Sequence, residues 1–394
     1  RRDLVHPRLA VTAPTRETRG MRLLVINGPN LNLLGTREPD IYGSETLTDL
    51  ERKWRMRATQ HAIGIHAVQS NHEGELIDVL HGEGTRADGV IINPGALSHY
   101  SYALHDAMAA ITVPVVEVHN SIIHEREAWR RTSVTAPAAE RVIVGRGTRG
   151  YLDAIDHLRA LITHPPVTVS YGDGADQVID IRVPQGATGT VALIHGGFWR
   201  SIWARDIMDS LAVHIAERGW ATANIEYRRG PGSFASSHTD ITDAVASLPG
   251  HVGSAGERTV AVGHSAGGYL ALRQAIGEGG IPAIALAPVI DLDAVSRGRV
   301  DDDPISAYLG ATSVEDPSLW DAASIPSRLS ARAALIHGDA DESLPIDHSV
   351  AFAASTGVDL VALPGADHMA LIDPMSPAAD ALLTTLDAFF EVTT

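Results

Sequence analysis

The sequence contains no cysteine, and its 31 basic residues include a single lysine, Lys53. The absence of cysteine excludes disulfides, thiolate zinc sites and cysteine nucleophiles, although it does not decide the compartment. A mechanism that forms a Schiff base would have to use Lys53, because no other side chain in the sequence carries the required amine. Lys53 lies in the polar helical stretch "LERKWRMR", with arginines on both sides. We therefore expect no lysine-dependent covalent chemistry.

Positive charge and long apolar runs are also scarce. The formal net charge is −17, and the sequence has no basic stripe of the kind that binds nucleic acid or an anionic membrane. No apolar run approaches the roughly 20 residues that span a bilayer. Residues 1–20 contain five arginines and no apolar core, which argues against a secretory signal and predicts a mobile tail. We expect a cytoplasmic protein with small-molecule substrates, without nucleic-acid or membrane partners.

With 394 residues, the chain is long enough to predict two domains. Over residues 21–163, short β-branched runs alternate with helical stretches of about 20–25 residues, as parallel crossover connections require. The predicted strands are "RLLVI", "IHAVQS", "GVIINP", "VPVVEV" and "RVIVG". This pattern predicts a flavodoxin-like, doubly wound parallel sheet with ligands at the carboxyl ends of its strands.

A Pro-Pro pair and several turn residues then interrupt the pattern and predict a linker over residues 164–174. A second α/β series fills residues 175–394, with at least six or seven strands. The predicted strands are "VIDIRV", "TVALIHGG", "ATANIEY", "RTVAVGHS", "AIALAPV", "AALIHGD" and "DLVALPG". The fold class is therefore α/β in both domains.

An arginine and a tyrosine lie five residues apart in the loop after the first predicted strand. This loop reads "NGPNLNLLGTREPDIYG" and contains Arg37 and Tyr42. A guanidinium close to a phenol lowers the pKa of the phenol, so the pair predicts a phenolate that serves as a base. Because a proton next to a ketone is only weakly acidic, its removal needs such a base and a stabilised enolate.

Five motifs in the first half resemble those of the type II 3-dehydroquinate dehydratases. They are "GPNLNLLGTREPDIYG", "QSNHEGELID", "NPGALSHYS", "EVH" and "REAWRRTS", in order and at compatible spacings through nearly all of residues 21–160. The resemblance implies an anti elimination of water through an enolate, without a metal or an organic cofactor. It also implies a homo-oligomer built from trimers, which in this family gather into dodecamers.

The resemblance assigns catalytic roles to five residues. Tyr42 would remove the C2 proton while Arg37 keeps it as a phenolate, and Asn30 would position a water that stabilises the enolate. His119 would protonate the departing C1 hydroxyl, with Glu117 fixing its orientation. The loop from about residue 34 to residue 42 would close over the substrate.

Five further residues would bind the substrate. Asn93, His99 and Arg130 would bind the ring hydroxyls, and Ser121 with nearby backbone would hold the carboxylate. Asp106 would reach the site of a neighbouring subunit.

The sequence departs from the family pattern at two places. His105 precedes Asp106 where the family usually has arginine, and Asn120-Ser121-Ile122 stands where it usually has an apolar residue, serine and asparagine. These changes border the carboxylate site and a subunit contact. They bear on substrate affinity, and on substrate identity, more than on the type of reaction.

The second half contains a G-x-S-x-G pattern, Gly263 to Gly267, between a β-branched run and a helical run. Such a context is typical of a nucleophile elbow, which raises the hydroxyl of Ser265 above a sheet. Asp341 and His368 each follow a later predicted strand, and the order serine, aspartate, histidine is that of an α/β-hydrolase triad. Asp339 is the alternative acid, but the spacing of "HGDADESLP" favours Asp341.

The loop "LIHGGFWR" predicts the oxyanion hole, because glycines allow backbone N–H groups to approach an anion. We expect its donors to be Gly197 and Phe198, with the N–H of Ala266. Through "HGGFW", residues 167–392 resemble α/β-hydrolases of the esterase and kynurenine formamidase-like group. Two interpretations of the nearby aromatic residues stay open, because they either line an acyl or formamide pocket or pack in the core. These residues are Trp199, Trp203 and Phe234.

The sequence thus predicts a bifunctional enzyme, a 3-dehydroquinate dehydratase fused to a serine hydrolase that cleaves an ester or amide. One hypothesis is that the hydrolase releases quinate-type acids from esters and the dehydratase acts further along that route. The alternative is a serine hydrolase, an esterase or arylformamidase, whose N-terminal domain is only an oligomerisation scaffold or a ligand sensor. Neither half is expected to need a metal or cofactor.

Overall fold

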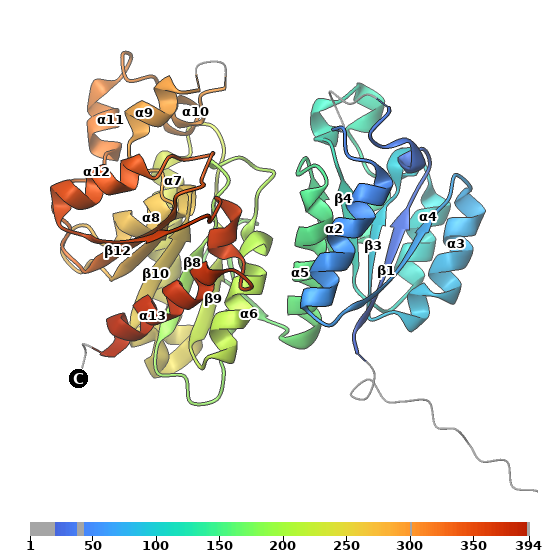
Figure 1. The fold of residues 1–394 in the computed structure, drawn as a ribbon, viewed down its shortest axis with the longest axis horizontal. Helices are drawn as coiled ribbons and strands as arrows, with labels where there is room; N and C mark the ends of the chain where they lie inside the picture. The colour runs from blue at the N-terminus through green and yellow to red at the C-terminus, as the bar shows by residue number, and fades with distance from the viewer. Residues whose placement is uncertain (1–19, 38–42, 300–301, 392–394) are drawn as a thin grey trace, which may run out of the picture. The chain divides into compact units, whose positions relative to one another are not determined.

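The computed structural model describes residues 20–37, 43–299 and 302–391, and Figure 1 shows its elements. Internal contacts divide the chain into two compact units, with the boundary between Ile155 and Asp156. This boundary falls inside helix α5 (Arg149–Thr163). The predicted mobile tail, apart from Gly20, and the predicted base Tyr42 lie outside the described residues.

The first unit is built on a parallel sheet, as predicted. Within the described residues its strands pair in the order β2-β1-β3-β4-β5, with every neighbour parallel. The strands are β1 (Arg22–Asn27), β2 (Gly64–Gln69), β3 (Gly89–Asn93), β4 (Val115–His119) and β5 (Arg141–Val144). The order reverses beside β1, so the loops after β1 and β3 meet at the carboxyl edge of the sheet.

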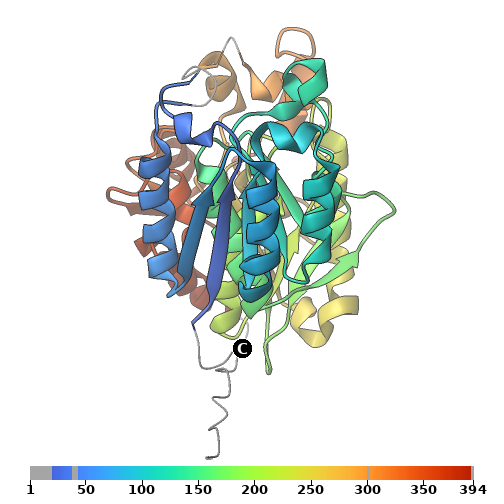
Figure 2. The same cartoon turned by 90° about the vertical axis from the view of Figure 1, so that its right-hand side faces the viewer.

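Helices cover both faces of this sheet (Figures 1 and 2). Helices α3 (Glu73–Gly82) and α4 (Tyr102–Ala110) pack their leucines on one face of β1 and β3. On the other face, Trp54 of α2 (Leu47–Gln60) contacts Tyr151 of α5, with ring centroids 5.1 Å apart.

Side chains at the N-termini of these helices fix where they begin. The Thr46 hydroxyl accepts from the Asp49 N–H at 3.1 Å, and the Asp49 carboxylate accepts from the Thr46 N–H at 3.2 Å. This reciprocal capping box satisfies N–H groups that have no partner inside α2. At α4 the cap is a single hydrogen bond, in which the Ser101 hydroxyl accepts from the Leu104 N–H at 2.9 Å.

The second unit contains a mixed sheet. Its strand order within the described residues is β13-β12-β11-β10-β8-β9-β7-β6, with β6 and β7 antiparallel to their neighbours and the remaining pairs parallel. The strands are β6 (Val167–Ser170), β7 (Val178–Arg182), β8 (Thr190–Ile194), β9 (Ala221–Ile225), β10 (Thr259–His264), β11 (Ala283–Leu286), β12 (Ala333–Gly338) and β13 (Asp359–Leu363).

The predicted linker is corrected at one point, because strand β6 lies within residues 164–174. The run Val167, Thr168, Val169 is β-branched and pairs with β7 at the edge of the sheet. The preceding Pro165-Pro166 pair suggested a break, but prolines are compatible with the start of an edge strand. The chain therefore enters the second sheet sooner than its turn residues indicated.

Apolar side chains of the second sheet are buried on both faces. The residues of one face pack against α7 (Phe234–Val252) and α8 (Ala266–Gln274). The opposite face packs against α6 (Asp209–Glu217) and α13 (Pro377–Glu391). The remaining helices are α9 (Leu292–Arg297), α10 (Pro304–Leu309), α11 (Pro317–Ala323) and α12 (Asp347–Thr356).

Helix α8 begins directly after β10, and two glycines allow this. A Cβ on Gly263 would lie 1.9 Å from the carbonyl oxygen of Gly267, and one on Gly267 would lie 2.1 Å from that of Ile194. Real side chains do not fit at such distances, so these positions require glycine. The helix is consequently held close above the centre of the sheet.

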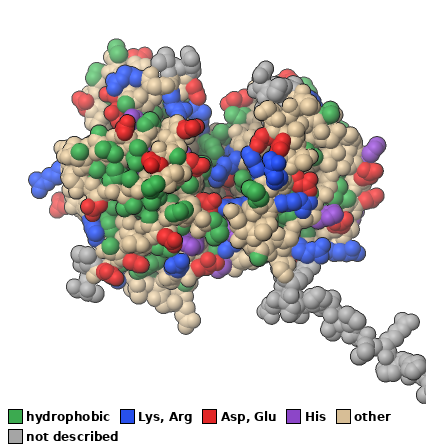
Figure 3. All heavy atoms as spheres, viewed as in Figure 1, with side chains coloured by type: hydrophobic (Ala, Val, Ile, Leu, Met, Phe, Trp, Pro, Cys, Tyr) green, Lys and Arg blue, Asp and Glu red, His purple; other side chains and the backbone are tan. Residues whose placement is uncertain are grey.

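No helix in the described part of the chain is long and apolar enough to cross a membrane. On the face of the molecule drawn in Figure 3, basic side chains are interspersed with acidic ones rather than gathered in a stripe.

We predict that Gly263→Ala lowers the stability of the second unit by roughly 1–3 kcal/mol or more, because the new methyl group overlaps the start of α8. Gly250→Ala is the matched control, since Gly250 lies in α7 and an added Cβ would meet no atom within 4 Å apart from its own helix backbone and its chain neighbours. That control should stabilise by roughly 0.5–1 kcal/mol through helix propensity. Thermal unfolding midpoints of both variants measure the difference, and equal midpoints would contradict the proposed close packing.

Candidate active sites

The loops after β1 and β3 touch because Gly28 has no side chain. The Gly28 N–H donates to the Asn93 carbonyl at 2.8 Å, and a Cβ on Gly28 would lie 2.4 Å from the carbonyl oxygen of Pro94. Two residues further on, Asn30 has φ 67°, a left-handed conformation that asparagine tolerates better than most residues. This turn directs the loop over the carboxyl edge of the sheet.

A pocket of about 180 Å³ lies at this edge of the first sheet. It brings together most of the residues predicted from the sequence. Those lining it are Asn30, Arg37, Asn93, His99, His119, Ser121 and Arg130.

Two predicted residues lie elsewhere. Glu117 does not line the pocket but is hydrogen-bonded to His119. Asp106 is on α4 with its side chain 83% exposed, where His105 contacts it at 3.0 Å. The proposed contact of Asp106 with a neighbouring subunit stays a prediction, as does the pairing of Arg37 with Tyr42.

Glu117 and His119 form a buried pair at the end of β4. His119 Nε2 donates to Glu117 Oε1 at 2.7 Å, and the hydroxyls of Ser133 and Thr135 donate to the two carboxylate oxygens, each at 2.6 Å. Burial alone would raise the pKa of Glu117, but these three hydrogen bonds outweigh it and hold the pKa below its ordinary value. The carboxylate is therefore ionised at neutral pH and fixes the ring of His119.

A second histidine, His99, borders the pocket beside an aromatic side chain. His99 Nδ1 is 2.9 Å from the Thr132 carbonyl oxygen, and its ring meets Trp129 edge-on at 5.5 Å. Burial lowers the pKa of His99, with the Thr132 carbonyl opposing the shift. The Arg130 guanidinium lies 4.1 Å from the Trp129 ring centroid, which keeps this cation oriented beside the pocket.

The ionisable side chains that line the pocket are all basic. They are Arg37, His99, His119 and Arg130, and no acidic side chain is among the described residues that line it. Such a lining favours an anionic ligand.

Ser265 in the second unit occupies the sharp turn between β10 and α8. Its φ is 56° and its ψ is −117°, a backbone conformation that costs free energy for a residue with a side chain. The Ser265 N–H donates to the Leu286 carbonyl at 2.8 Å, which helps to hold the turn. This is the geometry expected of a nucleophile elbow.

Asp341 and His368 meet at the carboxyl edge of the second sheet. His368 Nδ1 donates to Asp341 Oδ2 at 2.6 Å, while Oδ1 accepts from two backbone N–H groups at 2.8 and 2.9 Å. Burial would raise the pKa of Asp341, but hydrogen bonds from His337 and His368 hold it well below its usual range. The alternative acid, Asp339, bonds the Gly365 N–H instead.

His368 lies next to the nucleophile elbow. Its carbonyl oxygen is 2.9 Å from His264 Nε2, and the two rings are 4.5 Å apart. Because His264 directly precedes Ser265, this contact places the three predicted triad residues at one edge. His337, which the sequence analysis did not single out, is a second imidazole on Asp341, 3.3 Å from Oδ2.

The loop after β8 approaches the elbow closely. A Cβ on Gly196 would lie 2.8 Å from the Ser265 Cβ, so only glycine allows this approach. The next two residues, Gly197 and Phe198, have φ of 107° and 49°, and Ala266 is buried. Beneath them, His195 Nε2 contacts Glu226 at 2.9 Å.

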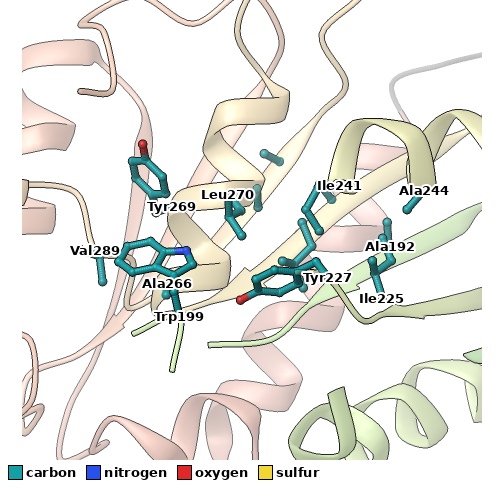
Figure 4. Close-up of a cluster of buried hydrophobic side chains, with 14 of the residues drawn as sticks. Ala192, Trp199, Ile225, Tyr227, Ile241, Ala244, Ala266, Tyr269, Leu270 and Val289 are labelled. Atoms are coloured by element: carbon teal, nitrogen blue, oxygen red, sulfur yellow. The ribbon is translucent and has the colours of Figure 1, made fainter. Parts of the chain in front are cut away.

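Trp199 packs in the core. It is 1% exposed, and its ring stacks on Tyr308 with centroids 3.8 Å apart and planes 6° from parallel. Figure 4 shows it with Tyr227 and Tyr269 around the start of α8. Phe234 and Trp203 are only partly buried and pack on the two core clusters. Of the two interpretations of these aromatics, packing therefore holds for Trp199.

No cluster of three or more side chains able to hold a metal ion occurs among the described residues.

Comparisons with known proteins match the two units to different families. The class II dehydroquinase profile matches residues 21–159. The 3-dehydroquinate dehydratase of Roseiflexus castenholzii is 54% identical over 138 residues, which are 35% of this chain and 88% of the relative. The chain belongs to the class II dehydroquinase family. The Bacillus licheniformis enzyme of the same name is 55% identical over 139 residues, 34% of this chain and 93% of that enzyme.

The dehydroquinase domain is followed by an esterase-like α/β-hydrolase domain, because the BD-FAE profile matches residues 179–280. A candidate thioesterase from Silicibacter sp. tm1040 has a related structure, with a TM-score of 0.50 and 21% identity, covering 59% of this chain and 90% of that one. At this identity the likeness concerns the fold alone. The predicted fusion of two enzyme domains is confirmed.

We predict that Glu117→Gln destabilises the dehydroquinase domain by about 1–3 kcal/mol at neutral pH, because one amide oxygen replaces two acceptors and the amide N–H₂ faces a buried donor. The folded pKa of Glu117 lies below its ordinary 4.5, so its contribution is present above that value and is lost as pH falls through the folded pKa.

Denaturant unfolding of wild type and Glu117→Gln at about pH 7 and about pH 3.5 measures this dependence. The difference between the two proteins should shrink at the lower pH. Exposed Glu125 provides the control, and Glu125→Gln should change stability little at either pH. A gap for Glu117→Gln that is equal at both pH values would contradict the ionised pair.

Proposed function

We propose that the dehydroquinase domain converts 3-dehydroquinate to 3-dehydroshikimate by anti elimination through an enolate. The observation that carries the proposal is the basic pocket with the buried Glu117–His119 pair at its edge. A polyhydroxylated carboxylic acid suits such a pocket, because cations attract its carboxylate and amide and imidazole groups bind its hydroxyls.

In the proposed reaction, the Tyr42 phenolate takes the proton from C2, and the electron pair forms an enolate with the C3 ketone. Arg37 lowers the pKa of the phenol, and a water held by Asn30 stabilises the enolate oxygen. The enolate then collapses to a C1–C2 double bond, and the C1 hydroxyl leaves as water with a proton from Nδ1 of the His119 imidazolium, because Nε2 is bonded to Glu117. Glu117 keeps the imidazole oriented for this transfer.

The remaining pocket residues bind the substrate in this proposal. Asn93, His99 and Arg130 bind the ring hydroxyls. Ser121 and adjacent backbone hold the carboxylate. Asp106 serves the site of a neighbouring subunit in a trimer-based oligomer.

We predict that Tyr42→Phe lowers the rate of dehydration at least about 100-fold, since general-base catalysis contributes about 10²–10⁴. The conjugated enone product is followed by its ultraviolet absorbance. Tyr102→Phe is the matched control because Tyr102 is exposed and lies outside the pocket lining, so it should retain the wild-type rate. Equal rates for the Tyr42→Phe variant and the wild type would exclude Tyr42 as the base.

For the second domain we propose hydrolysis of an ester or amide through an acyl-serine intermediate. Ser265 Oγ attacks the carbonyl carbon and His368 takes its proton, later passing it to the leaving group. Asp341 stabilises the charged imidazole. Backbone N–H groups of Gly197, Phe198 and Ala266 are the proposed donors to the oxyanion.

The rival account, in which the first domain is only a scaffold or a ligand sensor, makes a different prediction. A scaffold would show no dehydration, and a sensor would bind 3-dehydroquinate tightly without turnover. The basic lining and the Glu117–His119 pair favour the enzyme, because a scaffold does not need a buried charge held beside a pocket.

We predict that Asp341→Asn lowers the rate of 4-nitrophenyl acetate hydrolysis by about 10²–10⁴-fold. The reason is that the His368 imidazole loses the carboxylate that stabilises its charged form and fixes its tautomer. Ser265→Ala should abolish formation of the acyl-enzyme, because the attacking hydroxyl is removed. Asp339→Asn is the matched control, since Asp339 bonds the Gly365 N–H and not His368. A larger loss in Asp339→Asn than in Asp341→Asn would reverse the assignment of the acid.

Hydrolysis by the wild type is also measured with two natural substrate classes, quinate esters and N-formylkynurenine. Quinate esters should be cleaved if the two domains act along one route. Rapid cleavage of N-formylkynurenine together with inertness toward quinate esters would contradict that hypothesis and favour an arylformamidase.

A further inference from the structure

His195 is a fully buried histidine whose two ring nitrogens both contact oxygen acceptors. It directly follows β8 and is 0% exposed. Nδ1 lies 2.8 Å from the Gly196 carbonyl oxygen, and Nε2 lies 2.9 Å from Glu226 Oε1. A carbonyl and a carboxylate only accept hydrogen bonds, so each ring nitrogen has to donate one. A neutral imidazole carries a single N–H, so only the imidazolium satisfies both contacts.

Glu226, which directly follows β9, is an ionised carboxylate in these contacts. Its Oε1 also accepts from Arg229 Nη1 at 2.5 Å, and its Oε2 accepts from the Arg205 N–H at 3.1 Å. Burial would raise the pKa of Glu226, but the charge of His195 and its hydrogen bond outweigh burial and hold the pKa at about 2. Because these partners all donate to the carboxylate, Glu226 has no proton to offer to Nε2 of His195.

The surroundings of His195 favour a positive charge on its ring. Tyr227 stacks on the imidazole, with ring centroids 4.5 Å apart and planes 23° from parallel, and the face of an aromatic ring attracts a cation. The other charged groups around Glu226 form two arginine–aspartate pairs, so they leave its charge to be matched by the imidazolium. These pairs are Arg205 with Asp180 and Arg229 with Asp176. Buried charges are tolerated when they are paired in this way.

The ring of His195 is connected to the proposed oxyanion hole through one peptide group. The Gly196 carbonyl belongs to the same peptide group as the Gly197 N–H, which is a proposed donor to the oxyanion. A hydrogen bond to the oxygen of a peptide group polarises the group and strengthens its N–H as a donor, and a charged donor does this more than a neutral one. No backbone oxygen among the described residues accepts from the Gly197 N–H. A Cβ on Gly196 would lie 2.8 Å from the Ser265 Cβ, so this peptide group lies beside the nucleophile.

We propose that His195 is held as an imidazolium and is the positioning residue of the oxyanion hole, where it orients and polarises the peptide group between Gly196 and Gly197. The proposal rests on the proposed hydrolase function of the second domain. Glu226 keeps the ring charged, the ring donates to the Gly196 oxygen, and the Gly197 N–H donates to the oxyanion that forms when Ser265 attacks the substrate. Because the positive charge is in place before the reaction begins, it stabilises the oxyanion without reorganisation.

The protonation of His195 is measured by ¹⁵N NMR of the ring nitrogens in the histidine-labelled full chain, with His195→Asn for assignment. At about pH 8 most histidines are neutral, because they ordinarily titrate near 6.5, but we expect both ring nitrogens of His195 to carry a proton. Glu226→Gln removes the negative charge and keeps the shape, so the ring should become neutral. Glu226→Asp keeps the charge, so the ring should stay charged. A singly protonated ring in the wild type would overturn the proposal, whether or not the variants fold.

Hydrolysis of 4-nitrophenyl acetate by the same variants distinguishes the charge of Glu226 from its shape. Glu226→Gln should lower kcat about 10- to 100-fold, somewhat less than the roughly 10²–10³ that loss of a whole oxyanion donor costs. KM should change little, because the oxyanion exists only in the transition state and intermediate. Glu226→Asp should retain more activity than Glu226→Gln, although glutamine is closer to glutamate in shape. The opposite order would overturn the proposal.

Asp240→Asn is the matched control for Glu226→Gln. Asp240 is also a buried carboxylate that binds an arginine, but its partners are Arg228 and Gln177 rather than His195. The control should therefore keep the wild-type kcat and a doubly protonated His195. An equal loss of kcat in Asp240→Asn and Glu226→Gln would show a general effect of disturbing buried charge and would overturn the proposal.

The two measurements also separate this proposal from that of the hydrolase, because the protonation of His195 is observed without turnover. A wild type that hydrolyses the ester and has a singly protonated His195 would refute the role of His195 alone. A wild type that has the imidazolium but cleaves no ester or amide would refute the hydrolase function, and the role of His195 in an oxyanion hole with it, while confirming the charged ring.

Discussion

A buried carboxylate that binds a histidine organises each of the two sites in this chain. Glu117 holds His119 at 2.7 Å and Asp341 holds His368 at 2.6 Å. A buried charge is tolerated only when it is fully hydrogen-bonded. Hydroxyl groups complete the shell of the first carboxylate, and backbone N–H groups complete that of the second. Each carboxylate is thereby ionised, and each imidazole has one nitrogen occupied and the other free for chemistry.

The two pairs are assembled in different ways. Glu117 and His119 are two residues apart on one strand, so the alternation of side chains along β4 places both on one face. Asp341 and His368 follow the neighbouring strands β12 and β13, and they meet because the sheet orders these strands side by side. A Cβ on Gly338 would lie 2.0 Å from the Ala366 carbonyl oxygen, so glycine is needed for the two loops to come together.

This difference explains what the sequence could predict. The strand alternation that creates the first pair is visible in "EVH", and the doubly wound order of the first sheet followed from the repeated strand-and-helix pattern. The choice between Asp339 and Asp341 rested on motif spacing and needed the structure, since both follow the same strand. Strand β6 escaped prediction because the adjacent Pro-Pro pair and glycines obscured a short β-branched run.

Two buried polar groups also escaped prediction, for a physical reason. The second imidazole on Asp341, His337, is separated from it by a turn that returns the chain to the strand end. Asn120 was noticed only as a departure from a family pattern, and its two unpartnered atoms became evident from the packing around it. Sequence patterns indicate which groups can form hydrogen bonds, but only the folded arrangement shows which of them are left without partners.

The most direct test of this account is the protonation of the two imidazoles, measured by ¹⁵N NMR of the ring nitrogens at alkaline pH, with His119→Gln and His368→Gln for assignment. We expect neutral His119 to carry its proton on Nε2 and neutral His368 to carry its proton on Nδ1. Each preference should be lost only when its own carboxylate is replaced, in Glu117→Gln or Asp341→Asn respectively. Tautomers averaged as in free imidazole, and unchanged by either substitution, would contradict the central role of the buried carboxylates.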